Sequence, residues 1–253
     1  IRDRFWVTKK QLFADAVVDG KPSNMFSEHA NAMALATRVA TRDQAAAIAR
    51  QMTVSDDNDF VRRNSGVTIV TPAMSYALHA GLCQYGYAED SLNLFRRRFE
   101  RMLAPETNQT LWEEWWLDGT GRSGRFRKGK TRSDAQTESA FPPALFGEYV
   151  LGVRPTKPGF KEVTIFRSPS GIQLIEGAVP TPLGLLEVKW NMRDAGSGQL
   201  QLTIPEGMRV RVDASSLSSG EDRSIELNGE VIAPPPKDNP FVDISAGRHV
   251  LRF

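Results

Sequence analysis

Apolar residues recur with the period of an α-helix from the start of the chain to about residue 155. The pattern predicts a short hairpin around Asp19-Gly20, helices over residues 28–39, 42–52, 72–85 and 88–103, and a last helix that begins at Pro142 or Pro143. Ser27, Thr41 and Thr71 are predicted N-caps, because a side-chain oxygen there accepts hydrogen bonds from the first turn. Paired helices of this kind indicate a bundle or an α/α toroid, with too few helices to close a toroid alone.

After Pro155 apolar and polar residues alternate, as in half-buried strands. Turn signals such as Asn228-Gly229 separate the apolar runs. Several short strands separated by turns predict an antiparallel β-sandwich. The strands are expected at residues 163–166, 172–175, 185–190, 200–204, 210–212, 225–227 and 249–253. The chain is therefore divided into a helical domain, residues 1–155, and a β domain, residues 156–253.

The composition excludes several classes of function. The 32 Lys and Arg residues are nearly balanced by 30 Asp and Glu residues, so the net charge of +2 predicts no general attraction to nucleic acid or to a membrane. No apolar run reaches the roughly 20 residues that a membrane span requires. With one cysteine and three histidines, neither an internal disulfide nor a metal site is expected, and we expect no cofactor. The first six residues resemble the end of a helix, which indicates a fragment of a longer chain.

The densest candidate for chemistry is the segment Trp112-Glu113-Glu114-Trp115-Trp116. It holds three of the five tryptophans around two carboxylates. Aromatic rings stack on the apolar faces of sugars, and carboxylates supply the acid, base or nucleophile for glycosidic cleavage. An apolar wall also raises the pKa of a carboxyl group and so tunes it for proton transfer. The alternative interpretation is a Trp-rich turn of the core with exposed acids.

This segment, with Thr110 before it, resembles the Thr-x-Trp-Glu signature of bacterial α-L-rhamnosidases of glycoside hydrolase family 78. Four more segments are similar to the family and follow its order along the chain. They are the His-Ala-Asn-Ala helix within residues 28–36, Ser133-Asp-Ala-Gln136, Leu151-Gly-Val-Arg-Pro155 with Pro158-Gly-Phe160, and a Thr-Pro-x-Gly hairpin within residues 179–190. Each motif is weak alone, whereas five in order are fairly specific.

The resemblance implies an inverting glycoside hydrolase that releases terminal α-L-rhamnose, or a similar deoxysugar, from an oligosaccharide or polysaccharide. It implies that residues 1–155 are the C-terminal part of an (α/α)6 barrel whose remainder, in the same polypeptide or another chain, is the partner. Glu113 is then the general base, and the general acid lies upstream of this chain. The implied substrate-binding residues are His29, Asn31, Trp112, Trp115, Trp116 and Gln136. The family also favours a bacterial periplasmic or extracellular location.

Other interpretations stay open at several positions. Gln136 stands where the family commonly has a histidine; a glutamine forms hydrogen bonds but takes no proton at neutral pH, which leaves a different sugar open. His29 either faces the barrel mouth or fixes the preceding loop by hydrogen bonds. The basic residues within 122–132 form either a solvated loop or a surface for an anionic polysaccharide. The rival function is a non-catalytic carbohydrate-binding or structural fragment of a degenerate hydrolase.

Overall fold

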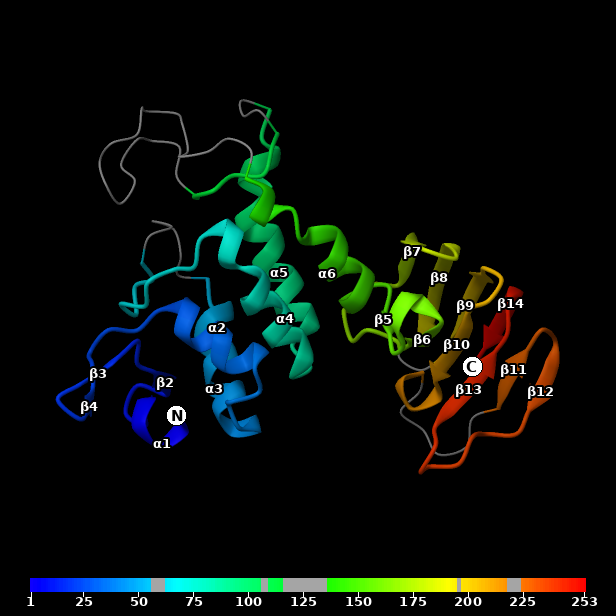
Figure 1. Cartoon of the computed structure of the whole chain (residues 1–253), viewed down its shortest axis with the longest axis horizontal. Coiled ribbons are helices and arrows are strands. Elements are labelled where there is room, and N and C mark those ends of the chain that lie inside the picture. Colours follow the sequence, from blue (N-terminus) through cyan, green and yellow to red (C-terminus); the bar gives the residue numbers. More distant parts are fainter. Residues whose placement is uncertain (56–61, 106–108, 116–135, 195–196, 218–223) are drawn as a thin grey trace. The chain divides into compact units, whose positions relative to one another are not determined.

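The chain forms two compact units, Ile1–Pro143 and Ala144–Phe253 (Figure 1). The computed structural model describes residues 1–55, 62–105, 109–115, 136–194, 197–217 and 224–253. The first unit is helical and the second consists mainly of antiparallel sheets, so the predicted order of helices before strands is confirmed. A boundary at residue 155 between a helical domain and a β domain stays a prediction.

Two small hairpins open the first unit after the short helix α1 (Arg2–Phe5). Strand β1 (Trp6–Val7) pairs with β2 (Leu12–Phe13), and β3 (Val17–Val18) pairs with β4 (Lys21–Pro22). The predicted hairpin at Asp19-Gly20 is confirmed. Both turn residues have positive φ, 49° and 76°, as a tight hairpin turn requires.

Four longer helices follow: α2 (Glu28–Ala36), α3 (Arg42–Thr53), α4 (Tyr76–Gln84) and α5 (Ala88–Phe99). Two of the three predicted N-caps are confirmed, since Ser27 accepts a hydrogen bond from the Ala30 N–H and Thr41 forms a capping box with Gln44. The side chain of Thr71 forms no capping hydrogen bond. Short 3-10 turns, η1 (Pro72–Met74) and η2 (Glu100–Leu103), precede α4 and extend α5. No helix in the described ranges is long and apolar enough to cross a membrane.

Helices α2 and α4 pack closely because a glycine lies at their contact. A Cβ added to Gly81 would lie 2.6 Å from the Leu35 Cβ and 3.0 Å from the Ala36 N. The core of the helical unit forms around this contact and includes Leu35, Ile48, Leu78, Leu82 and Leu94. A glycine is needed here for the close approach of two backbones rather than for a turn.

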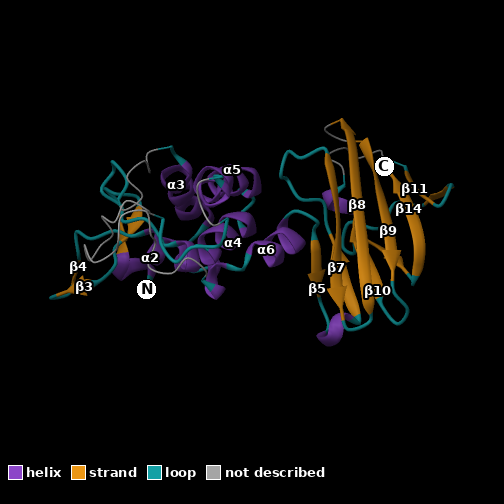
Figure 2. Ribbon diagram, turned by 90° about the horizontal axis from the view of Figure 1, so that it is seen from above, coloured by secondary structure: helices purple, strands orange, loops and turns teal. Residues whose placement is uncertain are grey.

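The second unit begins within α6 (Pro142–Tyr149) and contains two sheets (Figure 2). The four-stranded sheet has the order β13 (Phe241–Ile244), β10 (Arg209–Asp213), β6 (Glu162–Ile165), β5 (Val153–Pro155). The six-stranded sheet has the order β12 (Glu230–Ile232), β11 (Ile225–Leu227), β14 (Gly247–Arg252), β9 (Ser197–Ile204), β8 (Gly184–Asp194), β7 (Leu174–Thr181). All described pairs are antiparallel except β6 with β10.

One hydrophobic core serves both sheets of the second unit. It combines Val163 and Val210 of the four-stranded sheet with Val188, Leu200 and Leu251 of the six-stranded sheet, and all five are fully buried. In strands such as β6, β9 and β10 alternate residues therefore face the core, which is the periodicity that the sequence showed.

Candidate functional site

Glu113 is the carboxylate of the tryptophan-rich segment that reaches the surface. Its side chain is half-buried, whereas Glu114 is only 2% exposed, as is Trp112, and Trp115 is 1% exposed. A general base must meet both solvent and substrate. By this criterion Glu113, and not its neighbour, is the better candidate.

The two described tryptophans of the segment are packing groups. Trp112 and Trp115 join Ile69, Phe99 and Met102 in a small apolar cluster. The Trp115 ring lies edge-on to Phe99, with centroids 5.1 Å apart. Both rings are almost completely buried in this chain, and their contact with a sugar stays a prediction. Trp116 lies outside the described residues.

Hydrogen bonds fix the segment on both sides of Glu113. The Trp115 indole N–H donates to the Val70 carbonyl oxygen at 2.6 Å. The Ser139 hydroxyl donates to the Trp112 carbonyl oxygen at 2.7 Å. The backbone before and after Glu113 is therefore held by buried contacts, whereas Glu113 itself is half-buried.

Gln136 lies beside the same segment. Its backbone N–H donates to the Leu111 carbonyl oxygen at 2.8 Å, and its side-chain amide donates to the Glu138 carboxylate at 2.5 Å. The amide is half-buried. The structure thus brings Gln136 and Glu113 to neighbouring backbone segments, although 22 residues of sequence separate the two positions.

Asn31 and His29 differ in their surroundings on α2. The Asn31 amide is completely buried. It accepts a bond from the Phe13 N–H at 2.9 Å and donates to the carbonyl oxygens of Phe13 and Ser27 at 3.1 and 2.9 Å. Asn31 therefore ties the β2 segment to α2, a role that sequence analysis offered for His29. The His29 side chain is half-buried, and its sugar contact stays a prediction.

A buried ion cluster, which sequence analysis missed, centres on Glu28. Arg98 donates to both Glu28 carboxylate oxygens, at 2.9 and 2.8 Å, and Arg63 donates to Oε1 at 2.8 Å. The Val70 N–H donates to Oε2 at 2.9 Å. Burial alone would raise the pKa of Glu28, but the two guanidinium groups, Arg98 foremost, and the Val70 N–H hold this pKa below its usual value.

The cluster is linked to the candidate base through the Val70 peptide. Glu28 holds the Val70 N–H, and the Val70 carbonyl holds the Trp115 indole, two residues after Glu113. Glu28 lies in the segment of the His-Ala-Asn-Ala motif, and this position was the only feature of the sequence that pointed to Glu28. No feature of the sequence pointed to the two arginines, because they lie 35 and 70 residues away from Glu28.

His79 lies next to this cluster in an aromatic cage. It is completely buried, its Nδ1 lies 2.9 Å from the Ser91 hydroxyl, and the rings of Phe95, Phe99 and Phe141 surround it. Burial, assisted by the positive charge of Arg98, lowers the pKa of His79 to about 3. The imidazole is therefore neutral and structural at physiological pH.

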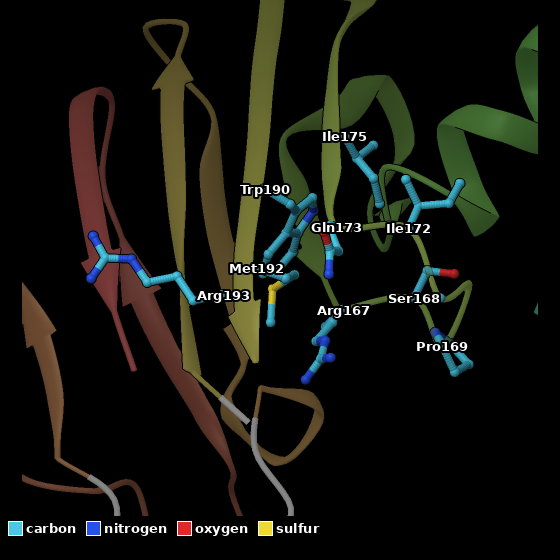
Figure 3. A pocket seen from close by; sticks show the side chains of 10 residues that line it. Arg167, Ser168, Pro169, Ile172, Gln173, Ile175, Trp190, Met192 and Arg193 are labelled. Atoms are coloured by element: carbon cyan, nitrogen blue, oxygen red, sulfur yellow. The ribbon is translucent and has the colours of Figure 1, made fainter. Parts of the chain in front are cut away.

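Hollows also occur away from this segment. In the second unit a pocket of about 390 Å³ lies between the end of β8 and the 167–173 loop, and the side chains of Gln173, Trp190 and Met192 face it (Figure 3). The first unit has a hollow of about 510 Å³ lined by Arg38, Arg42, Gln84, Tyr85 and Tyr87. Among the described residues no group of three or more His, Cys, Asp or Glu side chains is arranged to hold a metal ion.

Comparison with known proteins points to one family. A family model described as the bacterial alpha-L-rhamnosidase C-terminal domain matches residues 152–226. An α-L-rhamnosidase of Alteromonas sp. (strain LOR) is 41% identical over 63 residues, which are 24% of this chain and 6% of that protein. The chain is thus a small part of the length of this relative.

Solved structures extend the likeness into the helical unit. The GH78 family rhamnosidase of Bacillus sp. GL1 matches 84% of this chain with 25% identity and a TM-score of 0.68, over 21% of its own length. The α-L-rhamnosidase of Dictyoglumus thermophilum matches 99% of this chain with 14% identity and a TM-score of 0.69, over 27% of its length. That of Streptomyces avermitilis, solved with L-rhamnose, matches 96% with 15% identity and a TM-score of 0.60, over 22% of its length. The last two show a shared fold.

Proposed function

Because this chain belongs to the C-terminal region of the α-L-rhamnosidases of glycoside hydrolase family 78, we propose that it supplies the general base of an inverting glycosidase. Glu113 is that base. The substrate is a terminal α-L-rhamnose, or a similar deoxysugar, on an oligosaccharide or polysaccharide. By the family resemblance, the general acid belongs to the remainder of the enzyme, and this chain spans only 21% of the Bacillus rhamnosidase.

The observation that carries the proposal is a half-buried carboxylate on an immobilised backbone. Glu113 lies between two buried indole-bearing residues whose peptides and ring N–H are hydrogen-bonded to Ser139 and Val70. Catalytic groups depend on such support, because a displacement of about 1 Å can reduce the rate by about 100-fold. The ion cluster at Glu28 supports the same position through Val70.

In the proposed reaction the Glu113 carboxylate accepts a proton from a water molecule as its oxygen attacks the anomeric carbon. The glycosidic oxygen leaves with the proton of the general acid, and the configuration at the anomeric carbon inverts. An inverting pair of carboxyl groups stands roughly 6.5–9.5 Å apart, which leaves room for the water. Gln136 and His29 are proposed to bind sugar hydroxyls. The family-based roles of Asn31, Trp112 and Trp115 would require surfaces that are buried in this chain.

The proposed architecture completes the helical unit with helices from outside this chain. We propose that α2 to α5 form part of an (α/α)6 barrel and that the two sheets form a β-sandwich. Large apolar side chains exposed on the helical unit support the first point, namely Met33 at 51%, Met74 at 55% and Leu103 at 67%. The common core of the two sheets supports the second.

A second candidate function is a glycan-binding fragment without catalysis. It is favoured by Gln136, which takes the position of a histidine and accepts no proton at neutral pH. Both functions use the same surface, so hydrolysis itself decides between them.

Substitution of Glu113 in the complete protein tests the proposal. Glu113→Gln is expected to reduce the turnover of an aryl α-L-rhamnoside by about 10²–10⁴-fold, because the loss of general base catalysis has this size. Glu100→Gln, which changes an exposed glutamate in the η2 turn of the same unit, is the matched control and is expected to retain most of the activity. The first sugar released should have inverted anomeric configuration by NMR. Unchanged turnover in Glu113→Gln would remove Glu113 from the role, and a wild-type protein that binds rhamnosides without cleaving them would favour the second function.

A further inference from the structure

A hollow in the helical unit carries two arginines and two tyrosines. It measures about 510 Å³ and is lined by Arg38, Arg42, Gln84, Tyr85 and Tyr87. Arg38 follows the end of α2, Arg42 begins α3, and the other three residues end α4 or connect it to α5. The Tyr85 hydroxyl donates to the Ala40 carbonyl oxygen at 2.6 Å and so joins the two connections.

This hollow is separate from the candidate active site. Val70, which holds Trp115, precedes α4 in the chain, whereas Gln84 is the last residue of α4. Nine helical residues span about 13 Å at 1.5 Å per residue. The hollow and the Glu113 segment therefore lie at opposite ends of this helix.

The charge of the hollow is positive and uncompensated. Among the described residues that line it, none is acidic. Both arginines are exposed, and neither has an ion-pair or hydrogen-bond partner for its guanidinium group within the part of the chain that the structure describes. Two like charges at one hollow raise the local potential and attract an anion. Guanidinium groups also bind carboxylate and sulfate oxygens in pairs of parallel hydrogen bonds.

The other lining residues fit a sugar ring. Tyr85 and Tyr87 are half-buried; they pack against the core of the helical unit and also line the hollow. The bond from Tyr85 to Ala40 fixes the orientation of its ring. Such a fixed aromatic surface presents apolar area with little loss of side-chain entropy on binding. The amide of Gln84 adds a group that both donates and accepts.

The backbone of Arg38 adopts a conformation that is unusual for a residue with a side chain. Arg38 has a φ of 57°, in the left-handed region, at the end of α2. Glycine is the residue that adopts this conformation without steric cost, and it is common directly after helices. The chain instead places a guanidinium group at this strained position, facing the hollow.

We propose that this hollow binds a saccharide that carries a carboxylate or a sulfate group. The anionic group meets Arg38 and Arg42, and the ring lies against Tyr85 and Tyr87. The saccharide part of this inference rests on the proposed function, whereas the anion part follows from the charges alone. Such a site would hold a charged glycan at a distance from the bond that is cleaved.

Binding measurements on the complete protein test the proposal. The probes are a uronate oligosaccharide, a sulfated oligosaccharide, a neutral oligosaccharide of equal length and inorganic sulfate, each titrated by calorimetry. One or both charged saccharides should bind, with an affinity that falls as salt rises. The double variant R38G/R42Q should bind at least about tenfold more weakly, which corresponds to one lost charge-assisted hydrogen bond. R38G relieves the left-handed strain, so a loss of binding in it does not reflect misfolding.

Arg50→Gln, an exposed arginine of α3 outside the hollow, is the matched control and should leave affinity unchanged. Equal affinity for the neutral oligosaccharide would overturn the role of the anion, and equal affinity for inorganic sulfate would overturn the role of the sugar. Binding that survives in R38G/R42Q, or no binding of either charged probe, would overturn the site. Aryl rhamnoside turnover should not change in the double variant. A protein that binds the charged probes but lacks turnover would refute the proposed function and not this site.

Discussion

The ion cluster at Glu28 allows the most quantitative prediction. Glu28→Gln replaces the carboxylate by an amide of nearly the same shape, and it removes the negative charge that the guanidinium groups of Arg63 and Arg98 contact at 2.8 Å. All three side chains are completely buried. The oxygen of the new amide can still accept hydrogen bonds that one Glu28 oxygen accepts now. The amide NH2 group is itself a donor, and it must face the donors that the other carboxylate oxygen now accepts from. The variant therefore contains two buried positive charges that repel each other.

The expected cost follows from this burial. Removal of one partner from a buried ion pair destabilises a protein by about 3–5 kcal/mol, because the remaining charge stays desolvated. A domain has a total stability of about 5–15 kcal/mol. Glu28→Gln should therefore lower the free energy of unfolding of the helical unit by about 3–5 kcal/mol, a large fraction of the whole. The Val70 peptide should also lose rigidity, since Glu28 accepts its N–H.

Urea unfolding followed by helical circular dichroism measures this effect. Glu89→Gln is the matched control, because Glu89 is an exposed acid in the first turn of α5 and such surface changes usually stay within about 0.5 kcal/mol. The low pKa of Glu28 adds a pH signature. Its contribution is fully present above the unfolded-state pKa and is lost as pH falls through the lower folded-state pKa. If Glu28→Gln and Glu89→Gln unfold at the same urea concentration, the reasoning about the cluster is refuted.

Three further predictions concern positions elsewhere in the two units. The pKa of His79 is about 3 in the folded protein, whereas an unperturbed histidine has a pKa of 6.5, so only the unfolded chain gains this proton as pH falls below 6.5. In that pH range the free energy of unfolding of the wild type should fall by up to about 1.4 kcal/mol per pH unit more steeply than that of His79→Gln. Equal pH dependence in the two proteins would contradict the assignment. Gly152→Ala should destabilise the second unit by about 2–5 kcal/mol, since φ is 79° and the added Cβ would lie 1.8 Å from the Phe166 carbonyl oxygen; unchanged thermal unfolding would be incompatible with this packing. Trp115→Phe keeps an aromatic ring but loses the bond to Val70, so thermal unfolding should show a cost of about 1 kcal/mol. In the complete protein, Trp115→Phe should lower kcat for an aryl rhamnoside by a larger factor than it raises KM. A change in KM alone would argue against a role of Trp115 in positioning Glu113.

Local features of the fold could be predicted from the sequence because their determinants are close together in the chain. The Asp19-Gly20 hairpin, the Ser27 cap and the Thr41–Gln44 capping box each depend on residues within five positions of one another. Long strands with regular alternation, such as β8 and β9, were predicted for the same reason.

Short or exposed elements could not be predicted in this way. β12 (Glu230–Ile232) is short and mostly exposed, so it shows no alternation. β13 (Phe241–Ile244) follows a Pro-rich connector, and its pairing with β10 depends on residues about 30 positions earlier. Met74 lies within the predicted helix over residues 72–85, but it is exposed by 55% because it belongs to the 3-10 turn before α4.

The candidate site shows the same limit. The composition of residues 112–115 indicated aromatic and acidic groups but did not reveal which would be buried. In the structure both tryptophans enter a cluster with Ile69, Phe99 and Met102, and only Glu113 of the two carboxylates reaches the surface. The arginines that support this segment through Glu28 carry no local signal, because an ion pair across 35 or 70 residues depends on the whole fold.

The most direct test of the central claim is a crystal structure of the complete protein with a rhamnoside bound. The account predicts a water molecule within about 2.6–3.2 Å of the Glu113 carboxylate, on the side of the anomeric carbon opposite the leaving group. A Glu113 side chain that points away from the bound sugar, with another carboxylate holding that water, would contradict it.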